Sequence, residues 1–518
     1  LIGSAAGVVA ALVIAYLAGV VYYRGHLLRG TTINGINVSG KTVDQVQDAM
    51  KEYRLKVTEK GSDGEKLEDT ITAGELGIAL TDADKIKQII REQGCMGWFF
   101  KKGGNYTDDK LMAVDDARLA QRIRTLKGFS ADETVASQDA HISDYTEGKE
   151  YEIVKEVIGN QLDEEKTKTA VKEAVESMKE SIDLAKADCY KKPAVTSEDA
   201  ALKQTLQQMN QCLKAKITYD FDGQQEVVDA SLIHDWLKVK NGTVSLKKKK
   251  VEEYVANLRR AHDTIYRSRT FKTTSGKTVT INGGDYGWWM NTNGEIAKLT
   301  KQILAGKTVT RKPLYLQEAA SFGAHDYGDS YVEINLTAQH LYVYQKGEKV
   351  LESDFVSGNT SLGNGTPEGV YSLTYKEEMG TLNGENYSTP VSYWMPFNGN
   401  IGMHDATWRS QFGGNLYATG GSHGCINLPY KIAQKIYTYV EKGSPVICYK
   451  LKGSESSHLT PQTDAQIAQS VIDSINAIGK NPAAKRKRTT FSRTIYNRLN
   501  YAQRKLVTNY NKLVKAEQ

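Results

Sequence analysis

The chain has 518 residues, roughly three times the usual size of one domain, so we expect several domains. Charged residues make up 25%, hydrophobic residues 40%, and prolines number 9, which excludes a collagen-like, a fully disordered or a polytopic membrane chain. The net charge is +6, but residues 480–518 hold eleven Lys or Arg and one acid, so they carry +10 and the remainder −4. Because no basic field covers the whole chain, we expect no nucleic-acid partner.

The first 23 residues contain no Lys, Arg, Asp or Glu and are rich in Val, Ala, Leu and Ile. A helix of about 20 such residues spans the roughly 30 Å hydrocarbon layer of a membrane. A signal peptide is the alternative, but its apolar core is usually about 7–15 residues and no small-residue cleavage pattern follows Tyr23. We predict a transmembrane signal anchor over residues 1–23, which places the protein in the cell membrane as a single-pass protein with most of the chain extracytoplasmic.

Two blocks with mixed strand and helix patterns follow, residues 24–211 and 212–318. Each begins with a strand pair around a Gly-containing turn, and each closes with a helix and a Lys-Pro step. The two closing prolines, Pro193 and Pro313, are 120 residues apart. The shared order predicts an approximate duplication of an α+β domain. Within the first block, apolar residues at three- and four-residue steps predict helices over 43–53 and 163–187.

Five cysteines are too few for a disulfide-stapled scaffold, and an odd number leaves at least one thiol unpaired. Cys189 and Cys212 lie between the two blocks and could form a bridge outside the cell; buried free thiols are the alternative. Cys448 lies in the apolar strand 446–449, where a cysteine is typically a small buried hydrophobic residue.

Glycine and aromatic residues are concentrated in the string 281–289 of the second block. Glycine permits tight turns, and the rings of Trp288 and Trp289 could stack on sugar faces; core packing is the alternative for each Trp. The two blocks resemble the peptidoglycan-binding domains that precede a transpeptidase domain in Gram-positive cell-wall enzymes. That resemblance implies peptidoglycan as a partner, both its glycan strands and its stem peptides.

Residues 326–450 alternate apolar and polar positions over short strands separated by turns, at 331–336, 341–344 and 350–356. Period-two alternation with short turns predicts an antiparallel, mostly-β sandwich or barrel. One helix is expected over 428–441, ending at Gly443.

The reactive residues of this block are His404-Asp405 and, after seventeen intervening residues, the string 422–427, Ser-His-Gly-Cys-Ile-Asn. A cysteine nucleophile needs a nearby base to form the thiolate and donors to hold an oxyanion. His404 could reach Cys425 across the sheet, and the N–H groups of Gly424 and Cys425 could face a carbonyl group. The helix that begins nearby would add positive partial charge.

A zinc site is an alternative for His404, His423 and Cys425. A fourth ligand at a recognisable spacing is missing, however, and CxxC pairs are absent from the sequence. We therefore expect neither a metal nor a cofactor. The whole string instead resembles the L,D-transpeptidase signature, with every position matched, and the supporting segments 366–369 and 393–397 lie where that family has them.

The resemblance implies a role for each site residue. Cys425 would be the nucleophile and His404 its base, with the backbone carbonyl of Asp405 orienting the imidazole. His423 and Gly424 would shape the oxyanion hole together with Cys425. Further residues would bind substrate, either by fixing the loop or by lining a groove: Ser422, Asn427, Tyr393, Trp394 and Met395.

The implied reaction is peptidoglycan L,D-transpeptidation, an acyl transfer with a cysteine nucleophile. Cys425 would attack the bond between the third, diamino residue of a tetrapeptide stem and its D-Ala, form a thioester, and pass the acyl group to an amine of a neighbouring stem. With water as acceptor the protein would be an L,D-carboxypeptidase, and with no activity it would be a wall-binding surface protein. A sortase ranks below these, because a sortase should have an Arg after its Cys strand and this sequence has none between Cys425 and Arg486. Carbapenems should acylate Cys425.

Residues 451–518 are expected to form a small, basic, all-α segment, with Ile467, Val471 and Ile475 at helical spacing and a Lys-Arg run over 485–488. The segment resembles small helical repeats at the ends of clostridial surface proteins. Its charge could hold the enzyme to anionic wall polymers, or could lie on a solvated helical face. The sequence thus predicts a multidomain chain: an anchor, duplicated α+β domains, a mostly-β L,D-transpeptidase catalytic domain and this helical extension.

Overall fold

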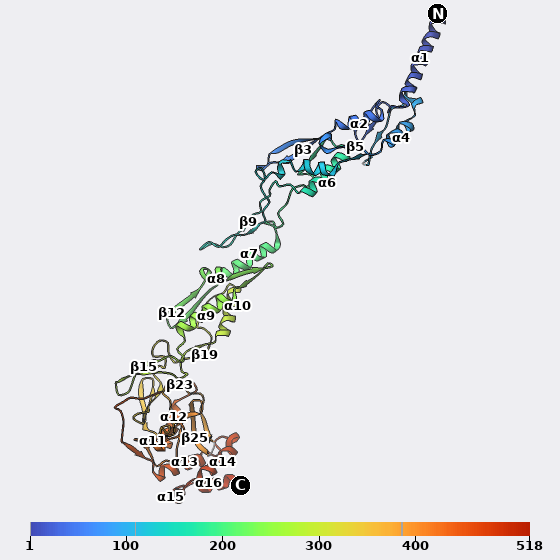
Figure 1. Ribbon diagram of the computed structural model, residues 1–518. Helices are drawn as coiled ribbons and strands as arrows, with labels where there is room; N and C mark the ends of the chain where they lie inside the picture. The colour runs from blue at the N-terminus through green and yellow to red at the C-terminus, as the bar shows by residue number, and fades with distance from the viewer. Residues whose placement is uncertain (1, 109, 385–386) are drawn as a thin grey trace. The chain divides into compact units, whose positions relative to one another are not determined.

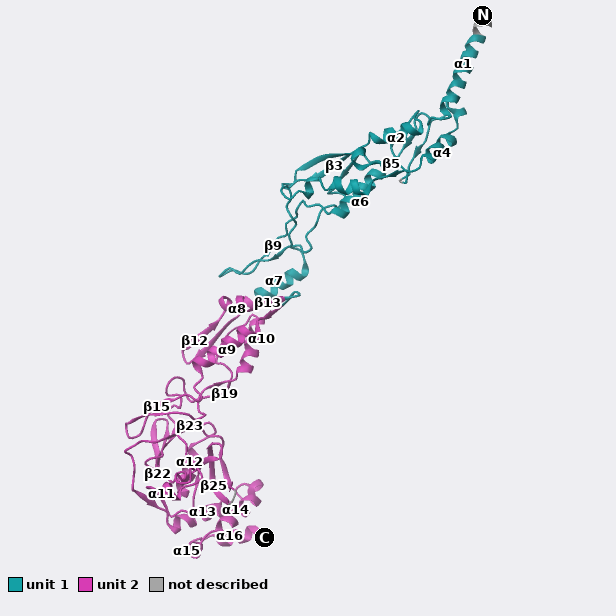
Figure 2. Cartoon of the chain, in the orientation of Figure 1, with its two compact units in different colours: residues 1–210, 240–243 teal, residues 211–239, 244–518 magenta. Residues whose placement is uncertain are grey.

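A computed structural model describes residues 2–108, 110–384 and 387–518 (Figure 1). Two compact units make up the chain (Figure 2). Unit 1 contains residues 1–210 and 240–243, and unit 2 contains residues 211–239 and 244–518.

The N-terminal helix α1 (Ile2–Tyr23) is long and apolar. Among the described helices it alone has the length and composition to cross a bilayer, over Ala6–Tyr23, and the side chains of this window are mostly exposed. Signal sequences share this length and composition, so α1 gives weak support for a membrane anchor.

Unit 1 is built on a three-stranded sheet in the order β10-β3-β4. β3 (Arg54–Lys60) and β4 (Lys66–Thr72) form an antiparallel hairpin, and β10 (Ser181–Asp183) joins β3 in parallel. The helices α2 (Val43–Lys51) and α6 (Glu164–Glu176) bury their apolar faces in the core of this unit. These elements confirm that strands and helices are mixed in this part of the chain.

Short elements complete unit 1. They are β1 (Thr32–Ile33), β2 (Ile36–Asn37), α3 (Ala73–Leu76), β5 (Ala79–Leu80), α4 (Ala83–Gln93), β6 (Asn105–Tyr106), β7 (Met112–Ala113), α5 (Asp116–Ile123), β8 (His141–Ile142) and β9 (Ile153–Val154), with 3₁₀ turns at Cys95–Gly97 and Lys127–Phe129.

Helix α6 is shorter than the sequence predicts, because it ends at Glu176 rather than at residue 187. Met178 adopts a left-handed φ of +49°, and Ser181–Asp183 then pairs with residues of β3. Pairing with a distant strand outweighs the helical spacing of the local sequence.

The sheet in the first part of unit 2 has the same pairing pattern as the sheet of unit 1. Its sheet runs β12-β11-β18, with β11 (Lys216–Phe221) and β12 (Gln224–Val228) antiparallel and β18 (Thr308–Arg311) parallel to β11. The helix α10 (Thr292–Leu304) precedes β18, as α6 precedes β10. Helix α7 (Ala200–Leu213), most of which belongs to unit 1, comes before this part. The remaining elements are α8 (Ala230–Trp236), β13 (Leu237–Lys240), β14 (Thr243–Leu246), α9 (Lys248–His262), β15 (Arg269–Lys272), β16 (Thr278–Ile281), β17 (Trp289–Met290) and β19 (Tyr315–Gln317).

The glycine-rich part of the string 281–289 contacts strand β23 (Gly369–Ser372) of the mostly-β domain that follows. Val370 N donates to Gly283 O at 3.2 Å, and Tyr286 N donates to Val370 O at 3.0 Å. Gly284 has a φ of +85°, and a Cβ at this position would lie 2.0 Å from Val370 O, so only glycine allows this approach.

The tryptophans of the same string differ in exposure. Trp288 is 3% exposed, stacks on Phe322 with ring centroids 4.1 Å apart, and donates from Nε1 to Ser321 O at 2.8 Å. Trp289 is 36% exposed. Core packing therefore accounts for Trp288, which presents no open face to a sugar.

Two sheets form the catalytic domain. One has the order β22-β21-β20-β29-β23 and the other β24-β25-β26-β28. Their strands are β20 (Tyr331–Asn335), β21 (His340–Gln345), β22 (Glu348–Asp354), β24 (Glu377–Gly384), β25 (Tyr387–Asn398), β26 (Ile401–Asp405), β28 (Ile426–Leu428) and β29 (Pro445–Tyr449). The domain is mostly β, but the sheets are mixed rather than antiparallel as predicted, because β20 pairs with β29 and β26 pairs with β28 in parallel.

Helix α12 (Tyr430–Tyr439) packs on this core through Ala433 and Ile436, and is shorter than the predicted 428–441. The domain also contains a short helix α11 (Leu416–Gly420) and the antiparallel pair of β27 (Gln411–Gly413) with β30 (Leu459–Pro461). Cys448 is fully buried in the core.

Four helices follow the catalytic domain, α13 (Asp464–Asn476), α14 (Lys485–Asn497), α15 (Tyr501–Lys505) and α16 (Tyr510–Glu517), with a 3₁₀ turn at Pro482–Ala484. They share a small apolar core that includes Ile467, Val471, Ile475 and Leu513. We refer to residues 464–517 as the C-terminal helical segment.

The cysteines of the described chain are all free thiols. Cys189 and Cys212 are both buried and form no bridge. Burial raises the pKa of Cys212 to about 11, so this thiol stays protonated at neutral pH.

Candidate active site

The parallel pairing of β26 and β28 brings the two reactive segments together. His404 lies opposite Asn427 in register, and Cys425 comes directly before β28. The twenty residues between His404 and Cys425 thus return to the same edge of the sheet, which places the cysteine and the histidine at one site.

Two hydrogen bonds hold the His404 imidazole. Nδ1 lies 2.9 Å from the carbonyl oxygen of Asp405, so Nδ1 must carry a proton and donate it. Nε2 lies 3.1 Å from Asn427 Nδ2, which donates to it. The basic lone pair is therefore on Nε2. Burial lowers the pKa of His404 to about 4, so the imidazole is neutral at pH 7.

Arg409 orients Asn427 and was not identified from the sequence. Its Nε donates to Asn427 Oδ1 at 2.7 Å and its Nη1 donates to Gly420 O at 2.9 Å. With Oδ1 occupied by a cation, the Asn427 amide must turn its NH₂ group toward His404. Arg409 belongs to no recognisable motif. The one sequence signal for it is its position, five residues after His404.

Cys425 is half-buried, and its Sγ donates to Asn400 O at 3.5 Å. Burial raises the pKa of this thiol to about 11, while a backbone hydrogen bond from Gly402 lowers it to a smaller extent. Among the described residues no hydrogen bond joins Sγ to His404. Thiol and imidazole are consequently both neutral in this resting arrangement.

The turn before Cys425 is fixed by Ser422. Its Oγ donates to Cys425 O at 2.6 Å and accepts from Gly424 N at 3.0 Å. Gly424 has a φ of +124°, and a Cβ there would lie 2.9 Å from Ile401 Cδ1. Thr366, from the segment 366–369, donates from Oγ1 to Gly424 O at 2.6 Å. Glycine is thus required at 424 by both backbone conformation and space.

Asp405 is buried and faces away from solvent. Its Oδ1 accepts from Tyr393 N at 2.9 Å, while its backbone carbonyl accepts from His404. Burial raises the pKa of its carboxyl group to about 6, although backbone hydrogen bonds from Tyr393 and Ser392 to this group lower it. The side chain therefore ties β25 to the end of β26.

Aromatic rings surround the imidazole and the turn. The rings of Trp394 and Trp408 lie 5.9 and 5.8 Å from that of His404. The ring of Tyr387 stacks on that of His423, with centroids 5.1 Å apart and planes 19° apart. Tyr387 and Trp408 carry no motif, so the sequence alone did not point to them.

Two residues expected in a substrate groove lie elsewhere. Met395 is 0% exposed and packs in the core of the domain. The hydroxyl group of Tyr393 accepts from Gln434 Nε2 at 3.0 Å on the side of α12. Trp394, between them in sequence, points to His404 because successive strand residues face opposite sides.

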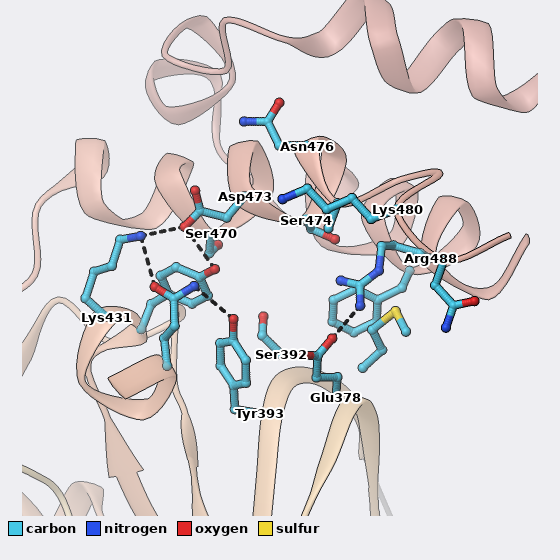
Figure 3. Close-up of a pocket in the computed structure, with 16 residues that line it drawn as sticks. Glu378, Ser392, Tyr393, Lys431, Ser470, Asp473, Ser474, Asn476, Lys480 and Arg488 are labelled. Carbon is cyan, nitrogen blue, oxygen red and sulfur yellow. Dashed lines mark hydrogen bonds and ion pairs between the residues drawn. The ribbon is translucent and has the colours of Figure 1, made fainter. Parts of the chain in front are cut away.

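A cavity of about 530 Å³ lies beside Tyr393, between α12, the β24–β25 hairpin and helices α13 and α14 (Figure 3). Lys431 Nζ and Asp473 Oδ2 point toward each other across it, 2.5 Å apart, and Arg488 pairs with Glu378 on its other side. Neither Cys425 nor His404 lines this cavity.

Within the described ranges, no group of three or more His, Cys, Asp or Glu side chains has an arrangement that could hold a metal ion. The chemistry open to the site is that of a cysteine and a neutral histidine held on adjacent strands. Fold and site together define a cysteine acyl-transfer enzyme on a mostly-β domain.

Comparison with known families identifies the domains. Residues 329–448 match the L,D-transpeptidase catalytic domain family, and residues 195–311 match the peptidoglycan binding domain family. The comparison with curated proteins gave no match.

Solved structures give further similarities. A crystal structure of a Cys-to-Ser mutant of Enterococcus faecium L,D-transpeptidase is 37% identical, with 48% of this chain and 100% of that chain covered and a TM-score of 0.40. The Ldtfm–avibactam carbamoyl enzyme is 38% identical, with 48% and 98% covered and a TM-score of 0.41. The catalytic domain of E. faecium L,D-transpeptidase acylated by ertapenem is 42% identical, with 24% and 98% covered and a TM-score of 0.22.

By the first of the two family matches, the chain carries an L,D-transpeptidase catalytic domain over residues 329–448. It is thus an enzyme of the acyltransferase class, with a peptidoglycan-binding domain ahead of its catalytic domain.

Proposed function

We propose that the protein cross-links peptidoglycan by L,D-transpeptidation, with Cys425 as nucleophile and His404 as base. The observation that carries the proposal is the arrangement around His404. Asp405 O accepts a hydrogen bond from Nδ1–H, and Asn427 faces Nε2. The basic nitrogen is therefore fixed on the side of β28, the strand that follows Cys425.

Acylation starts with proton transfer from Cys425 Sγ to His404 Nε2. Both atoms have other partners at rest, Asn400 O and Asn427 Nδ2, so this transfer begins with an exchange of partners. Such rearrangement is common, because catalytic hydrogen bonds tighten only when substrate is bound. The thiolate then attacks the carbonyl carbon that joins the third stem residue to D-Ala.

The tetrahedral intermediate collapses when the C–N bond breaks and the D-Ala amine leaves with the proton from His404, which forms the thioester. An amine of a second stem then attacks the thioester, His404 takes one of its protons, and that proton returns to the leaving Cys425 sulfur. The sum is one amide bond broken and one formed, with no oxidant or reductant.

The oxyanion is held by the turn 423–425. Since Ser422 Oγ already accepts from Gly424 N, the donors that remain for the oxyanion are in His423 and Cys425. Ser422 and Asn427 thus act by fixing the turn and the base. Trp394 and Tyr387 flank the acyl donor, while Tyr393 and Met395 support the strand from behind.

The cellular setting belongs to the same proposal. Helix α1 would anchor the chain in the membrane with the domains on the cell-wall side, and the two α+β regions would bind peptidoglycan. The shared strand orders β10-β3-β4 and β12-β11-β18 support a duplication, with domain ranges 24–211 and 212–318. The C-terminal segment 451–518, which is helical from residue 464 and not all-α because it contains β30, would contact anionic wall polymers through exposed basic residues such as Arg486.

Product analysis tests the proposal. The full chain in detergent is incubated with a disaccharide-tetrapeptide, and products are separated and weighed by mass spectrometry. We expect cross-linked dimer and free D-Ala from the wild type, the same from Cys448→Ala, and none from Cys425→Ala. Cys448 is a matched control because it is a second, fully buried cysteine of the same domain. Free tripeptide without dimer would make the enzyme a carboxypeptidase, and no product from folded wild type would leave a wall-binding role.

A further inference from the structure

The β24–β25 hairpin extends beyond the sheet that carries the active site. β25 pairs with β26 only from Trp394 to Asn398, and β24 is an edge strand. The outer half of the hairpin, Thr381–Gly384 with Tyr387–Pro390, therefore has only its own two-stranded ladder. An isolated two-stranded hairpin is marginally stable at best in water, so this half needs other support to keep one position.

The position of that outer half affects the active site. Tyr387 stacks on His423, two residues before Cys425. Farther along the same strand, the ring of Trp394 lies 5.9 Å from that of His404. The outer half of the hairpin thus contacts the turn that carries Cys425, the nucleophile of the proposed reaction.

Helix α14 supports the hairpin along its length. Lys487 Nζ lies 3.0 Å from Glu377 Oε1, and Arg488 forms an ion pair with Glu378. Farther out, Arg498 Nη2 donates to Ser388 O at 2.6 Å. The side chains of Arg488 and Glu378 are 19% and 42% exposed, so this ion pair is only partly shielded from solvent.

The helical segment is itself fixed to the rigid part of the domain. Asp473 on α13 accepts from Lys431 and Tyr430 of α12, at 2.5 and 3.1 Å. Just before α13, Gln462 Nε2 donates to Ala406 O and Arg409 O, at 3.2 and 2.8 Å, next to the residues that hold His404. The segment therefore bridges the base of the active site and the outer hairpin.

We propose that the C-terminal helical segment is a positioning element for the acyl donor: through Arg488, Lys487 and Arg498 it holds the β24–β25 hairpin so that Tyr387 stays against His423. Two members of the basic run 485–488 are thus used inside the molecule rather than for wall polymers. The inference rests on the proposed function only for the identity of the ligand, a donor stem peptide.

The test uses the full chain with charge reversals Arg488→Glu and Glu378→Arg, and the double variant that swaps the two charges. Lys485→Glu is the matched control, because Lys485 belongs to the same run and has no ion pair within the described residues. Each protein is assayed for KM and kcat with the tetrapeptide donor, and for hydrogen exchange of the amides of 381–384 and 387–390.

We expect each single reversal to raise the donor KM about three- to tenfold with little change in kcat, and to speed exchange in the outer hairpin. The double variant should restore both the donor KM and the exchange rate of the outer hairpin. Lys485→Glu should change neither quantity. A merely structural pair would lower the melting temperature without moving KM, and that result would overturn the inference. Unchanged hairpin exchange in both reversals would overturn it as well. An inactive wild type would instead contradict the proposed function, and the exchange data would still test the support of the hairpin.

Discussion

Arg409 gives the sharpest prediction, because its hydrogen bond to Asn427 fixes the amide that faces His404 Nε2. Replacing Arg409 with Ala leaves Asn427 Oδ1 without its donor in a site where Asn427 is 2% exposed. The amide can then rotate and present Oδ1 to His404 Nε2. That arrangement favours the tautomer with the proton on Nε2, which leaves Cys425 without a base and turns the Nδ1 lone pair toward Asp405 O.

The magnitude follows from the lost hydrogen bond. An unsatisfied buried acceptor costs about 1–3 kcal/mol, and the bond to a guanidinium is at the stronger end. The second bond of Arg409, to Gly420 O, adds little because Gly420 is exposed and water can replace the donor. If about 2 kcal/mol shifts the tautomer, acylation slows about 30-fold.

The assay is the rate of covalent adduct formation with ertapenem, followed by stopped-flow absorbance and checked by protein mass. Arg486→Ala is the control, an exposed arginine outside the site. Melting temperatures show whether the variant is folded. A rate that is unchanged or faster in folded Arg409→Ala would refute the reasoning, because Asn427 would then compete with Cys425 for Nε2 rather than fix the base.

Three further outcomes are expected. First, burial lowers the pKa of His404 to about 4 and raises that of Cys425 to about 11. The rate of adduct formation should therefore be nearly constant from about pH 8 to about pH 5 and fall tenfold per pH unit below about pH 4. A rate that already falls below about pH 6.5 would disagree. Second, Gly424→Ala should lower the free energy of unfolding by about 1–3 kcal/mol in a denaturant titration and abolish adduct formation, because the φ of Gly424 is +124° and Ile401 blocks a Cβ there. Near-normal acylation would count against this turn geometry. Third, Glu295→Gln should lower stability by about 3–5 kcal/mol with acylation by the remaining folded protein unchanged, since buried Glu295 pairs with Arg311. Its pKa is lowered in the fold, so the stabilisation is present above the unfolded pKa and is lost as pH falls through the folded pKa; equal acid sensitivity of variant and wild type would contradict this.

The sequence predicts those site residues that belong to a short, recognisable motif. The string 422–427 and His404 are local patterns, and the structure brings them together on paired strands. Arg409 acts through a single hydrogen bond with no spacing rule behind it, so it could be found only from coordinates.

Strand alternation explains one misplacement. Tyr393, Trp394 and Met395 are consecutive in β25, so they cannot all line one groove, because neighbouring side chains of a strand face opposite sides. Trp394 faces His404 and Met395 faces the core. The two-residue period of a strand is enough to divide these residues between two faces, and it requires only the sequence.

Long-range pairing explains the other differences. The parallel pairs β20–β29 and β26–β28 join segments far apart in sequence, and no local alternation indicates them. The helix expected over 163–187 stops at Glu176 because residues 181–183 pair with β3. The composition of the string 281–289 suggests a sugar platform, whereas its use, docking on β23, depends on a strand some eighty residues later.

The central claim is that Cys425 carries the acyl group of the donor stem. The most direct measurement is peptide mapping by tandem mass spectrometry of full-length enzyme quenched in acid during turnover of disaccharide-tetrapeptide. The account predicts a thioester of the disaccharide-tripeptide on the peptide that contains Cys425. It predicts none on the peptides that contain the other four cysteines, Cys95, Cys189, Cys212 and Cys448. An acyl group on another residue, or turnover by Cys425→Ala, would contradict it.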